Sequence, residues 1–294
     1  MTSTYHIPVL LDEIISYLDP QPGQTFIDGT VGQGGHAQVI LEHVIPGGRL
    51  LGIDKDPSNL EIAKERLASY SQSVVFVCDS YRNLKSIAKK YGISSVSGII
   101  LDLGFCSSQV DEAARGFSFQ EEGPLDMRYN LEQDLTAQII VNEWSEQELT
   151  EIFIRFGEEI NAKQIARAII QRRKQQPLET TIELAHLMTD LFPKKGRLHP
   201  ATKIFQALRI AVNHELNDLI EVLPQAVELL ASHGRLAVIS FHSLEDRILK
   251  DFFKQKEKEQ VIRKVTKSVV QANQKEKQKN HRARSAKLRV IEKL

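Results

Sequence analysis

Four short apolar runs in the first part of the chain each end in an aspartate. The aspartates are 26, 25 and 23 residues apart, and the runs are Thr25 to Asp28, Arg49 to Asp54, Val74 to Asp79 and Gly98 to Asp102. Amphipathic segments separate the runs, so each interval has room for one strand and one helix, and the pattern predicts a parallel sheet. The carboxyl ends of such strands meet at one edge, where ligands bind in open α/β sheets. One aspartate there is most often a helix cap or turn residue, but four in register predict a ligand site.

The first run leads into a glycine-rich stretch, and Phe26 to Leu41 reads FIDGTVGQGGHAQVIL. Glycines remove side chains from a turn, so that a bulky ligand can approach the backbone and the helix start behind it. Gly32 to Ala37 satisfies the G-x-G-x-x-G/A fingerprint, and Asp54 lies 20 residues beyond Gly34. This spacing leaves NAD and S-adenosylmethionine both open, because a carboxylate after the second strand accepts hydrogen bonds from either ribose.

The other acids favour S-adenosylmethionine. Asp28, directly before the glycine loop, suits the cationic ammonium at the amino-acid end of this cofactor and would repel a pyrophosphate. Asp79, followed by Ser80 and Tyr81, would place an acceptor and an aromatic ring beside an adenine. An NAD(P)-linked oxidoreductase is the alternative, although we find no Ser/Tyr/Lys constellation that would handle a hydride.

The strand pattern stops after Asp102, and Leu135 to Ile210 reads as almost wholly helical. We expect a further helix from Ala201 to Leu230, with a break near Pro224, and then a fifth strand, Gly234 to Ser240. The sequence therefore predicts an α/β fold whose sheet domain is split by an inserted helical domain.

Charge is distributed unevenly along this neutral chain. Ile248 to Leu294 holds 15 Lys and Arg against 5 Asp and Glu, a net charge of +10, which leaves −10 for the rest. A basic tail predicts a polyanionic partner, and a solvated, partly disordered terminus is the alternative. Within the tail we expect a helix, Leu244 to Lys254, and an antiparallel pair formed by Val261 to Val270 and Lys287 to Ile291, with a mobile polar stretch between the two runs.

Cysteine usage and the first residues indicate a cytoplasmic protein. Cys78 and Cys106 have neither CxxC nor Cys/His spacing, so we expect no disulfide framework and no zinc site. The N-terminal MTSTYHIPVLLDEII lacks the basic and long apolar regions of a signal peptide, and no apolar run approaches the length of a membrane span.

Longer motifs carry a resemblance to a known family. They are ILDLG (100–104), RGFSF (115–119), GPLDMR (123–128), FGEE (156–159), HPAT (199–202), FQALRIAVN (205–213), GRLAVISFHSLEDR (234–247) and RARSAKLR (282–289). From His6 to its C-terminus the chain resembles the bacterial MraW/RsmH family. These are S-adenosylmethionine-dependent methyltransferases that act on N4 of a cytidine in the decoding region of 16S ribosomal RNA.

The resemblance implies a class I, Rossmann-like methyltransferase sheet, residues 1–110 plus 208–294, with an inserted all-helical substrate-recognition domain, residues 111–207. It implies S-adenosyl-L-methionine as cofactor and 16S rRNA, within the small ribosomal subunit, as substrate, with no metal and no membrane. A homodimer is left open. Together with Asp28, the implied cofactor contacts are Gly34, Gly35, His36, Asp54, Tyr81, Asp102 and Gln109. Tyr81 stands where the family more often has Phe, and its ring can still stack.

The N4 amino group of cytosine is a poor nucleophile because its lone pair is delocalised into the ring. A hydrogen-bond acceptor for an amino proton would localise that pair, and Asp102 is our candidate. Its alternative roles are a cofactor ligand or a structural cap. Phe105 is a candidate to stack on the target base or, alternatively, a packing residue at the start of the insertion. Cys106 could attack the ring carbon C5 as a thiolate, but it has no evident base partner and is better explained as a small buried thiol.

A base locked in a helix cannot reach such a pocket, so the target must be unstacked and held. His242 could position substrate, or the following helix could be capped there through Ser243. Candidate phosphate contacts lie in the insertion, in its loop and in the tail: Arg167, Arg172, Arg173, Lys174, Lys194, Lys195, Arg197, Arg282, Arg284, Lys287 and Arg289. A ribosome-binding assembly factor without turnover is a third hypothesis.

Overall fold

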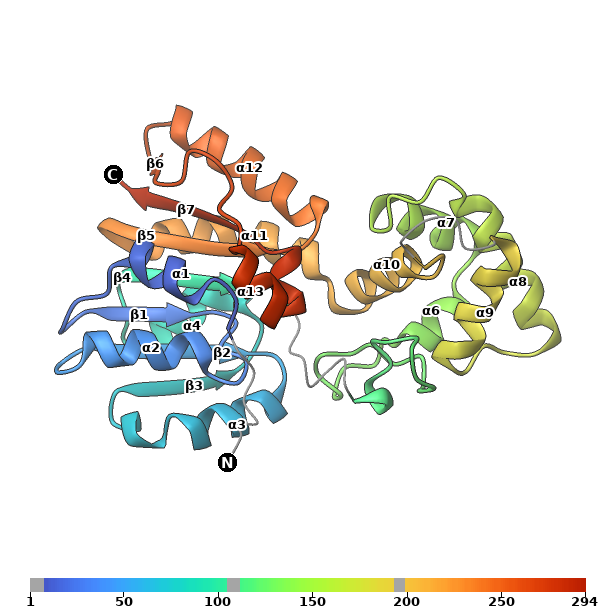
Figure 1. Ribbon diagram of the computed structural model, residues 1–294, viewed down its shortest axis with the longest axis horizontal. Helices are drawn as coiled ribbons and strands as arrows, with labels where there is room; N and C mark the ends of the chain where they lie inside the picture. The colour runs from blue at the N-terminus through green and yellow to red at the C-terminus, as the bar shows by residue number, and fades with distance from the viewer. Residues whose placement is uncertain (1–7, 105–111, 193–198) are drawn as a thin grey trace. The chain divides into compact units, whose positions relative to one another are not determined.

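The computed structural model describes residues 8–104, 112–192 and 199–294, and the chain divides into two compact units (Figure 1). Unit 1 comprises Met1–Gly104 and Leu216–Leu294, and unit 2 comprises Phe105–Glu215. The second unit is thus an insertion in the first. Its bounds are 105 and 215, where the sequence led us to expect 111 and 207.

Unit 1 is built on a seven-stranded sheet with the strand order β3-β2-β1-β4-β5-β7-β6. The first five strands are parallel, β7 runs antiparallel to β5, and β6 runs antiparallel to β7. This arrangement confirms the predicted α/β class. The strands are β1 (Thr25–Asp28), β2 (Arg49–Asp54), β3 (Val74–Cys78), β4 (Val96–Asp102), β5 (Leu230–Ser240), β6 (Ile262–Lys264) and β7 (Lys287–Lys293).

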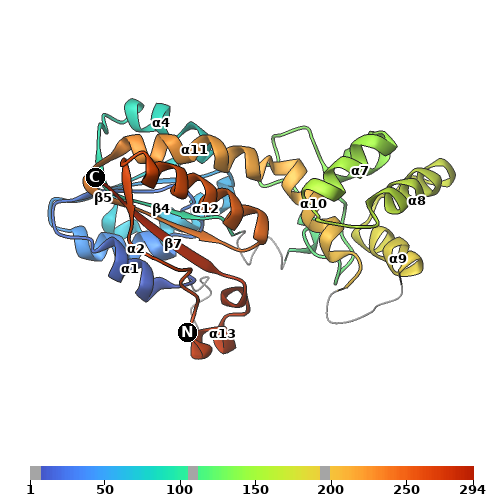
Figure 2. The same cartoon turned by 90° about the horizontal axis from the view of Figure 1, so that it is seen from above.

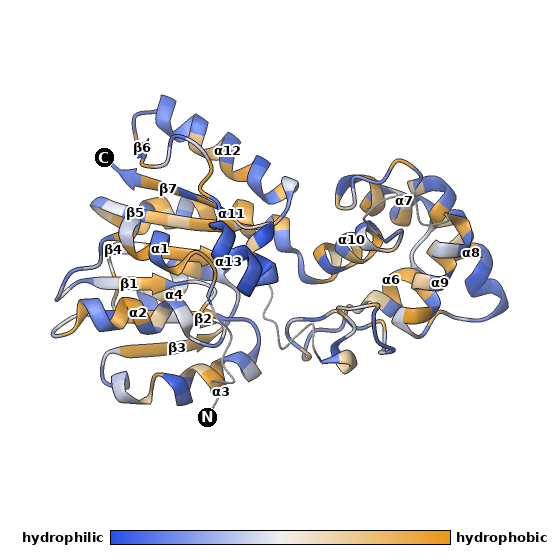
Figure 3. Ribbon diagram, viewed as in Figure 1, coloured by the Kyte–Doolittle hydropathy of each residue, from blue (hydrophilic) through white to orange (hydrophobic). Residues whose placement is uncertain are grey.

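Helices cover both faces of this sheet (Figure 2). One hydrophobic core joins the sheet to α1 (Leu11–Leu18), α2 (Gly35–Val44) and α3 (Pro57–Arg66). The other joins it to α4 (Leu84–Lys90), α11 (Glu215–Leu229) and α12 (Ser243–Lys258). Along β4, Ile100 packs into the first core and Ile99 and Leu101 into the second. Because both faces of β1, β2 and β4 are buried over most of their length, these strands read as apolar runs. Figure 3 shows orange segments along the sheet.

The helix expected from Ala201 to Leu230 is interrupted at His214, not near Pro224. α10 (Thr202–Asn213) ends where His214 adopts a left-handed φ of 55°, and Pro224 lies inside α11. The side chain of Asn213 fixes this end, since its Nδ2 donates to the carbonyl oxygens of Met127 (2.7 Å) and Arg209 (2.9 Å). A proline inside a helix costs about 3 kcal/mol, and burial of the apolar face of α11 offsets that cost.

The C-terminal segment completes the sheet. β6 and β7 pair as the sequence predicts, and β7 also joins β5. The polar stretch between them, which we expected to be mobile, instead forms α13 (Gln274–Lys279) and the short helix η4 (His281–Arg284). The reason is that Glu276 accepts a hydrogen bond from the Leu10 amide (2.7 Å), while Ala272, Ala283 and Ala286 are buried in the core of α1 and α2.

Unit 2 is helical and has its own hydrophobic core. The described residues of unit 2 form the helices η3 (Ala113–Arg115), α6 (Ala137–Glu143), α7 (Glu146–Arg155), α8 (Ala162–Gln175), α9 (Thr181–Leu191) and α10. α7 begins with a capping box at Ser145, and α9 begins with one at Thr180. In each box, the cap side chain accepts a hydrogen bond from the amide of the glutamate three residues later, and the glutamate side chain accepts one from the amide of the cap. No helix in the described ranges of the chain has the length and apolar character needed to cross a bilayer.

Candidate functional site

Three carboxylates end three neighbouring strands of unit 1. Asp28, Asp54 and Asp102 are the last residues of β1, β2 and β4, and β1 lies between the other two strands. Burial raises the pKa of Asp28 to about 8, and the nearby charges of Asp102 and Asp54 add to this rise. Burial also raises the pKa of Asp54 to about 6. A cationic ligand would relieve this repulsion and favour the ionised carboxylates, so the cluster fits the positive centres of S-adenosylmethionine.

The glycine loop folds back onto the second of these carboxylates. The Gly32 amide donates to Asp54 Oδ2 (2.8 Å), and Gly34 caps α2 in a left-handed conformation with φ 79°. A side chain is strained there, which explains the glycine. At Gly35, a Cβ atom would lie 3.2 Å from Pro8. The backbone conformation at Gly34 and the close approach of Pro8 at Gly35 therefore favour glycine whether or not a ligand approaches the loop.

The Asp54 carboxylate accepts hydrogen bonds from neighbouring residues and retains an acceptor position for a ligand. Its Oδ1 accepts hydrogen bonds from the Asp56 amide (2.8 Å) and Asn59 Nδ2 (3.4 Å), in addition to the Gly32 bond on Oδ2. A carboxylate offers about four acceptor positions. The remaining one suits a ribose hydroxyl, the role that the sequence predicts for Asp54.

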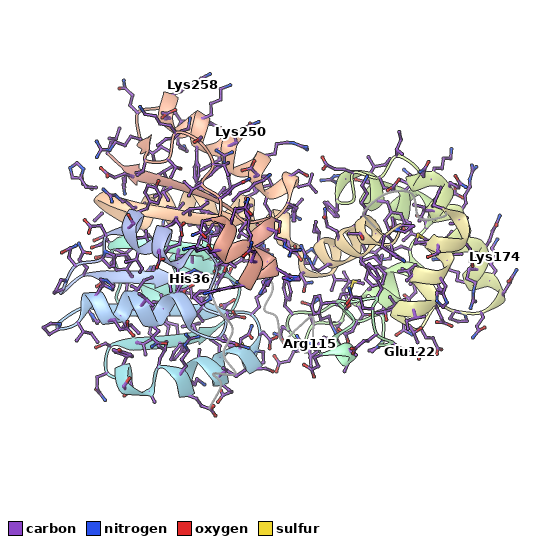
Figure 4. The ribbon with its side chains drawn as sticks, viewed as in Figure 1. His36, Arg115, Glu122, Lys174, Lys250 and Lys258 are labelled. Atoms are coloured by element: carbon purple, nitrogen blue, oxygen red, sulfur yellow. The ribbon has the colours of Figure 1, made fainter. Side chains whose placement is uncertain are left out.

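His36 lies in the first turn of α2 and is 6% exposed. Its Nε2 is 2.9 Å from the Val9 carbonyl oxygen, which can only accept a hydrogen bond, so this nitrogen carries the proton. The other ring nitrogen, Nδ1, lies 4.0 Å from Asp102 Oδ2. Figure 4 labels His36 in unit 1. The ring is thus oriented by the N-terminal segment and faces the carboxylate at the end of β4.

The Asp102 side chain is 18% exposed, and its surroundings shift its pKa in opposite directions. Burial raises its pKa, whereas His36 and Arg282 lower it. The Gly104 amide donates to Asp102 Oδ1 (3.2 Å). A Cβ atom on Gly104 would lie 2.7 Å from the Phe241 ring and 2.9 Å from Arg282 Nη2. Gly104 thus allows an aromatic ring and a guanidinium, 5.8 Å apart as a cation–π pair, to approach the end of β4.

Tyr81, predicted to lie beside the adenine, follows β3 at the start of a short helix. Ser80 caps the short helix η2 (Tyr81–Asn83), and Tyr81 is half-buried against the core that contains Leu101. Asp79 lies one residue beyond the end of β3. Its Oδ1 accepts from the Ser80 amide (2.6 Å) and from Asn83 Nδ2 (2.9 Å), so this oxygen orders the loop.

Several predicted site residues lie outside the described residues. These are Gln109 for the cofactor, Phe105, Lys195 and Arg197 for the RNA, and also Cys106 and Lys194. Their assignments remain predictions.

His242 itself caps α12, one residue earlier than the cap that we expected at Ser243. Its Nδ1 accepts from the Glu245 amide (3.4 Å), and Glu245 Oε2 accepts from the Phe241 amide (2.8 Å). The Nε2 atom is 3.1 Å from Glu245 Oε1 but has no hydrogen-bond partner within the described part of the chain. These contacts account for a structural role, and because Nε2 is itself buried, the substrate role expected for His242 stays a prediction.

The predicted phosphate contacts in the tail and in α8 differ in whether they are already paired with other side chains. Arg282 lies beside Gly104, and Arg284 is exposed, with its Nε 3.3 Å from the Lys277 carbonyl oxygen. Others are engaged within their own unit: Arg289 and Lys287 with Asp246, Arg167 with Glu146, and Arg172 with Glu183.

Arg173 and Lys174 are adjacent in α8 but differ in their contacts. Arg173 donates to the carbonyl oxygens of Val141 (2.9 Å) and Trp144 (2.7 Å), which holds the end of α6. Lys174 is exposed and pairs with none of the described residues; Figure 4 labels it. Of these two residues, only Lys174 is free to meet a phosphate.

Sequence reasoning missed two side chains. Phe241 follows β5 directly, and its place beside Gly104 could have been inferred from the pairing of adjacent parallel strand ends. Asp218 in α11 is 1% exposed and bonds Lys55, a residue 163 positions away. No local pattern could have predicted that long-range pair.

The comparisons with known proteins agree with the motifs. Residues 3–294 match the sequence model of the MraW methylase family. A ribosomal RNA small subunit methyltransferase H of Dehalococcoides mccartyi strain BAV1 is 46% identical, with 98% of this chain and 86% of the relative covered. The proteins of the same name from Brevibacillus brevis strain 47 and Heliobacterium modesticaldum strain Ice1 are 42% and 43% identical, with 99% of each chain covered. A solved structure, a putative rRNA methylase from Clostridium thermocellum, is 15% identical with a TM-score of 0.49, over 99% of this chain and 100% of that one.

Proposed function

Because the chain belongs to the MraW methylase family, we propose that it methylates the exocyclic N4 of a cytidine in the decoding region of 16S rRNA. Family membership makes it an S-adenosylmethionine-dependent methyltransferase and sets aside the NAD(P)-linked alternative. The target base and atom are our proposal. The observation that carries it is the mostly buried Asp102 carboxylate, with Gly104, Phe241 and Arg282 gathered beside it.

The cofactor would be held by the edge of the sheet in unit 1. The residues that we assign to it are Asp28 for the ammonium, Gly34, Gly35 and His36 at the start of α2, Asp54 for the ribose, Tyr81 for the adenine, Asp102, and Gln109. When bound, S-adenosylmethionine supplies an electrophilic methyl group on a positive sulfur, so the protein has to provide position and charge. The raised pKa values of Asp28, Asp54 and Asp102 support this assignment, because a positive ligand would be stabilised among them.

Asp102 is the group that we assign to the amino proton. The amino nitrogen would bond to the methyl carbon through its lone pair while the bond from that carbon to the positive sulfur breaks and S-adenosylhomocysteine leaves. The nitrogen would then have to lose one proton to remain neutral. A carboxylate that accepts a hydrogen bond from this N–H would localise the lone pair and could take the proton. A raised pKa makes Asp102 a stronger proton acceptor than an ordinary aspartate, provided that it is ionised. Arg282 and His36, which lower its pKa, support the ionised form.

The RNA would be bound by both units. We assign Arg282, Arg284 and His242 in unit 1, and Phe105, Lys195 and Arg197 in unit 2, to the substrate. Lys174 adds a free cation on α8. Residues 1–247 carry a net charge of −10, so we expect weak binding to naked RNA and a preference for the assembled surface of the small ribosomal subunit. Such a substrate would place the protein in the cytoplasm.

Product analysis tests this proposal. Small ribosomal subunits that lack the modification are incubated with the full chain and labelled S-adenosylmethionine, and the rRNA is digested to nucleosides. We expect the label in N4-methylcytidine at one position. Label on another atom would overturn the proposed target, and absence of label despite measured cofactor binding would favour the assembly-factor hypothesis.

A further inference from the structure

One face of α11 lies along the loop that carries Tyr81. The polar residues on this face recur at helical spacing, and each contacts residues 80–85. Glu221 pairs with Arg82, the Gln225 side chain bonds the backbone of Arg82 and of Lys85, and Glu228 pairs with Lys85. The fourth member of the row, Asp218, is the most deeply buried.

Asp218 joins two loops through a single oxygen atom. Its Oδ2 accepts from Lys55 Nζ (2.5 Å) and from Ser80 Oγ (2.9 Å), and the residue is 1% exposed. Its Oδ1 has no hydrogen-bond partner among the described residues, and Arg82 Nη1 lies 3.7 Å away. Burying a carboxylate costs folding free energy unless the group is paired. The hydrogen bonds from Lys55 and Ser80 must therefore offset the cost of burying Asp218.

Both partners are next to residues assigned to the cofactor. Lys55 directly follows Asp54, and Ser80 directly precedes Tyr81 and caps η2. The strands that lead to them are paired, with Asp54 opposite Cys78. Asp218 therefore fixes the separation between the loop that bears the ribose carboxylate and the loop that bears the aromatic ring.

We propose that Asp218 is a positioning residue for the adenosine half of S-adenosylmethionine. Through Lys55 and Ser80 it holds Asp54 and Tyr81 at the spacing that one nucleoside requires, without touching the ligand itself. This inference rests on the cofactor assignment in the proposed function. It is independent of the target base and atom.

The test uses the full chain carrying Asp218→Asn, with cofactor affinity measured by calorimetry in the absence of RNA. Two ligands are compared: S-adenosylmethionine and 5′-methylthioadenosine, which lacks the amino-acid end. Loss of a charged hydrogen bond predicts that both dissociation constants rise about tenfold. The KM for S-adenosylmethionine should rise in parallel, whereas kcat at saturating cofactor should stay within about twofold, because the reacting groups are unchanged.

Glu228→Gln is the matched control. It removes one carboxylate from the same helix face, but its pair with Lys85 is exposed (61% and 56%), so neither dissociation constant should change. Ser80→Ala is the milder second variant in case Asp218→Asn does not fold. It removes one of the two bonds to Oδ2, together with the Oγ cap of η2, and should weaken the binding of both ligands several-fold.

Two results would overturn the proposal. One is an unchanged 5′-methylthioadenosine affinity in a variant whose melting curve shows a folded protein. The other is a fall in kcat with no change in KM for the cofactor. Because both ligands are measured without RNA, methylation of another base or atom would defeat the proposed target and leave this test intact.

Discussion

His36 Nδ1 faces Asp102 Oδ2 at 4.0 Å, with the imidazole oriented from its far side by the Val9 carbonyl oxygen. Arg282 acts on the same carboxylate from the C-terminal segment. His36 and Arg282, from distant parts of the chain, thus counteract the burial that raises the pKa of Asp102. The ionisation of Asp102 is therefore set by long-range contacts, and it can be tested by removing one of them.

Arg282→Gln should move the acidic limb of the pH–rate profile to higher pH. Among the described residues, the charged or titratable groups that act on Asp102 include His36, Arg282, Glu245 and Asp28, and the charge of Glu245 raises its pKa. Without Arg282 the pKa of Asp102 rises further, so the ionised acceptor is lost at a higher pH as the solution is acidified. The rate of methyl transfer at saturating S-adenosylmethionine is the measurement.

Lys279→Gln is the control for this shift, because it removes the same charge from an exposed site on α13. Its profile should superimpose on that of the wild type. If the rate of methyl transfer by Arg282→Gln falls by the same factor at every pH, Arg282 serves RNA binding alone.

Asp28→Asn should stabilise the ligand-free protein at pH 8. The pKa of Asp28 is about 8 in the folded chain, against an ordinary value of 3.8. The wild type therefore loses stability as the pH rises from about 4 to 8, and the neutral amide does not. In thermal melts, the melting temperature of the variant relative to the wild type should be higher at pH 8 than at pH 5. Each kcal/mol of stability corresponds to about 2–4 °C in melting temperature. Parallel melting temperatures at the two pH values would contradict the burial argument.

The same variant should bind S-adenosylmethionine more weakly at pH 8. A carboxylate that ionises beside a cationic ammonium contributes to affinity, and an amide does not. Equal affinities for the two proteins would remove Asp28 from the cofactor site.

Gly104→Ala should reduce catalysis more than cofactor binding. The new methyl group would lie 2.7 Å from the Phe241 ring and 2.9 Å from Arg282 Nη2, so both would be displaced from the end of β4. We expect kcat to fall at least about tenfold, as for a misplaced catalytic group, with the cofactor dissociation constant within about threefold of the wild type. An unchanged kcat would show that neither Phe241 nor Arg282 serves the reaction.

Arg173→Ala and Lys174→Ala should separate structure from RNA binding in unit 2. Arg173 donates to two carbonyl oxygens at the end of α6, so its loss should cost about 1–3 kcal/mol of stability. Lys174 is exposed, so its loss should leave the melting temperature unchanged and reduce the salt dependence of binding to the small subunit. The opposite pattern would contradict the contacts assigned to α8.

The sequence predicts those parts of the site that local patterns determine. Asp28, Asp54 and Asp102 could be placed at one edge because apolar runs and helices alternate at a regular interval, and the parallel sheet puts those strand ends side by side. The glycine fingerprint likewise predicts the loop before α2, since backbone geometry at Gly34 requires a residue without a side chain.

Long-range contacts decide the features that could not be predicted. Because proline tends to break helices, the sequence favoured a break near Pro224. The helix instead ends at His214, where Asn213 contacts Met127 and Arg209. Composition favoured a mobile segment before β7, but the bond from Leu10 to Glu276 and three buried alanines order it. Asp218 gives no local signal because its partners come from other loops.

The measurement that tests the central claim most directly is the single-turnover rate of methyl transfer by Asp102→Asn, with modification-free small ribosomal subunits and saturating S-adenosylmethionine. The amide keeps the shape of the side chain but cannot accept a proton as the carboxylate does. If Asp102 accepts the amino proton, the rate should fall about 10²- to 10⁴-fold, and excess cofactor should not restore it. A rate that returns to the wild-type value at high cofactor concentration would show that Asp102 only binds S-adenosylmethionine, and it would contradict the account.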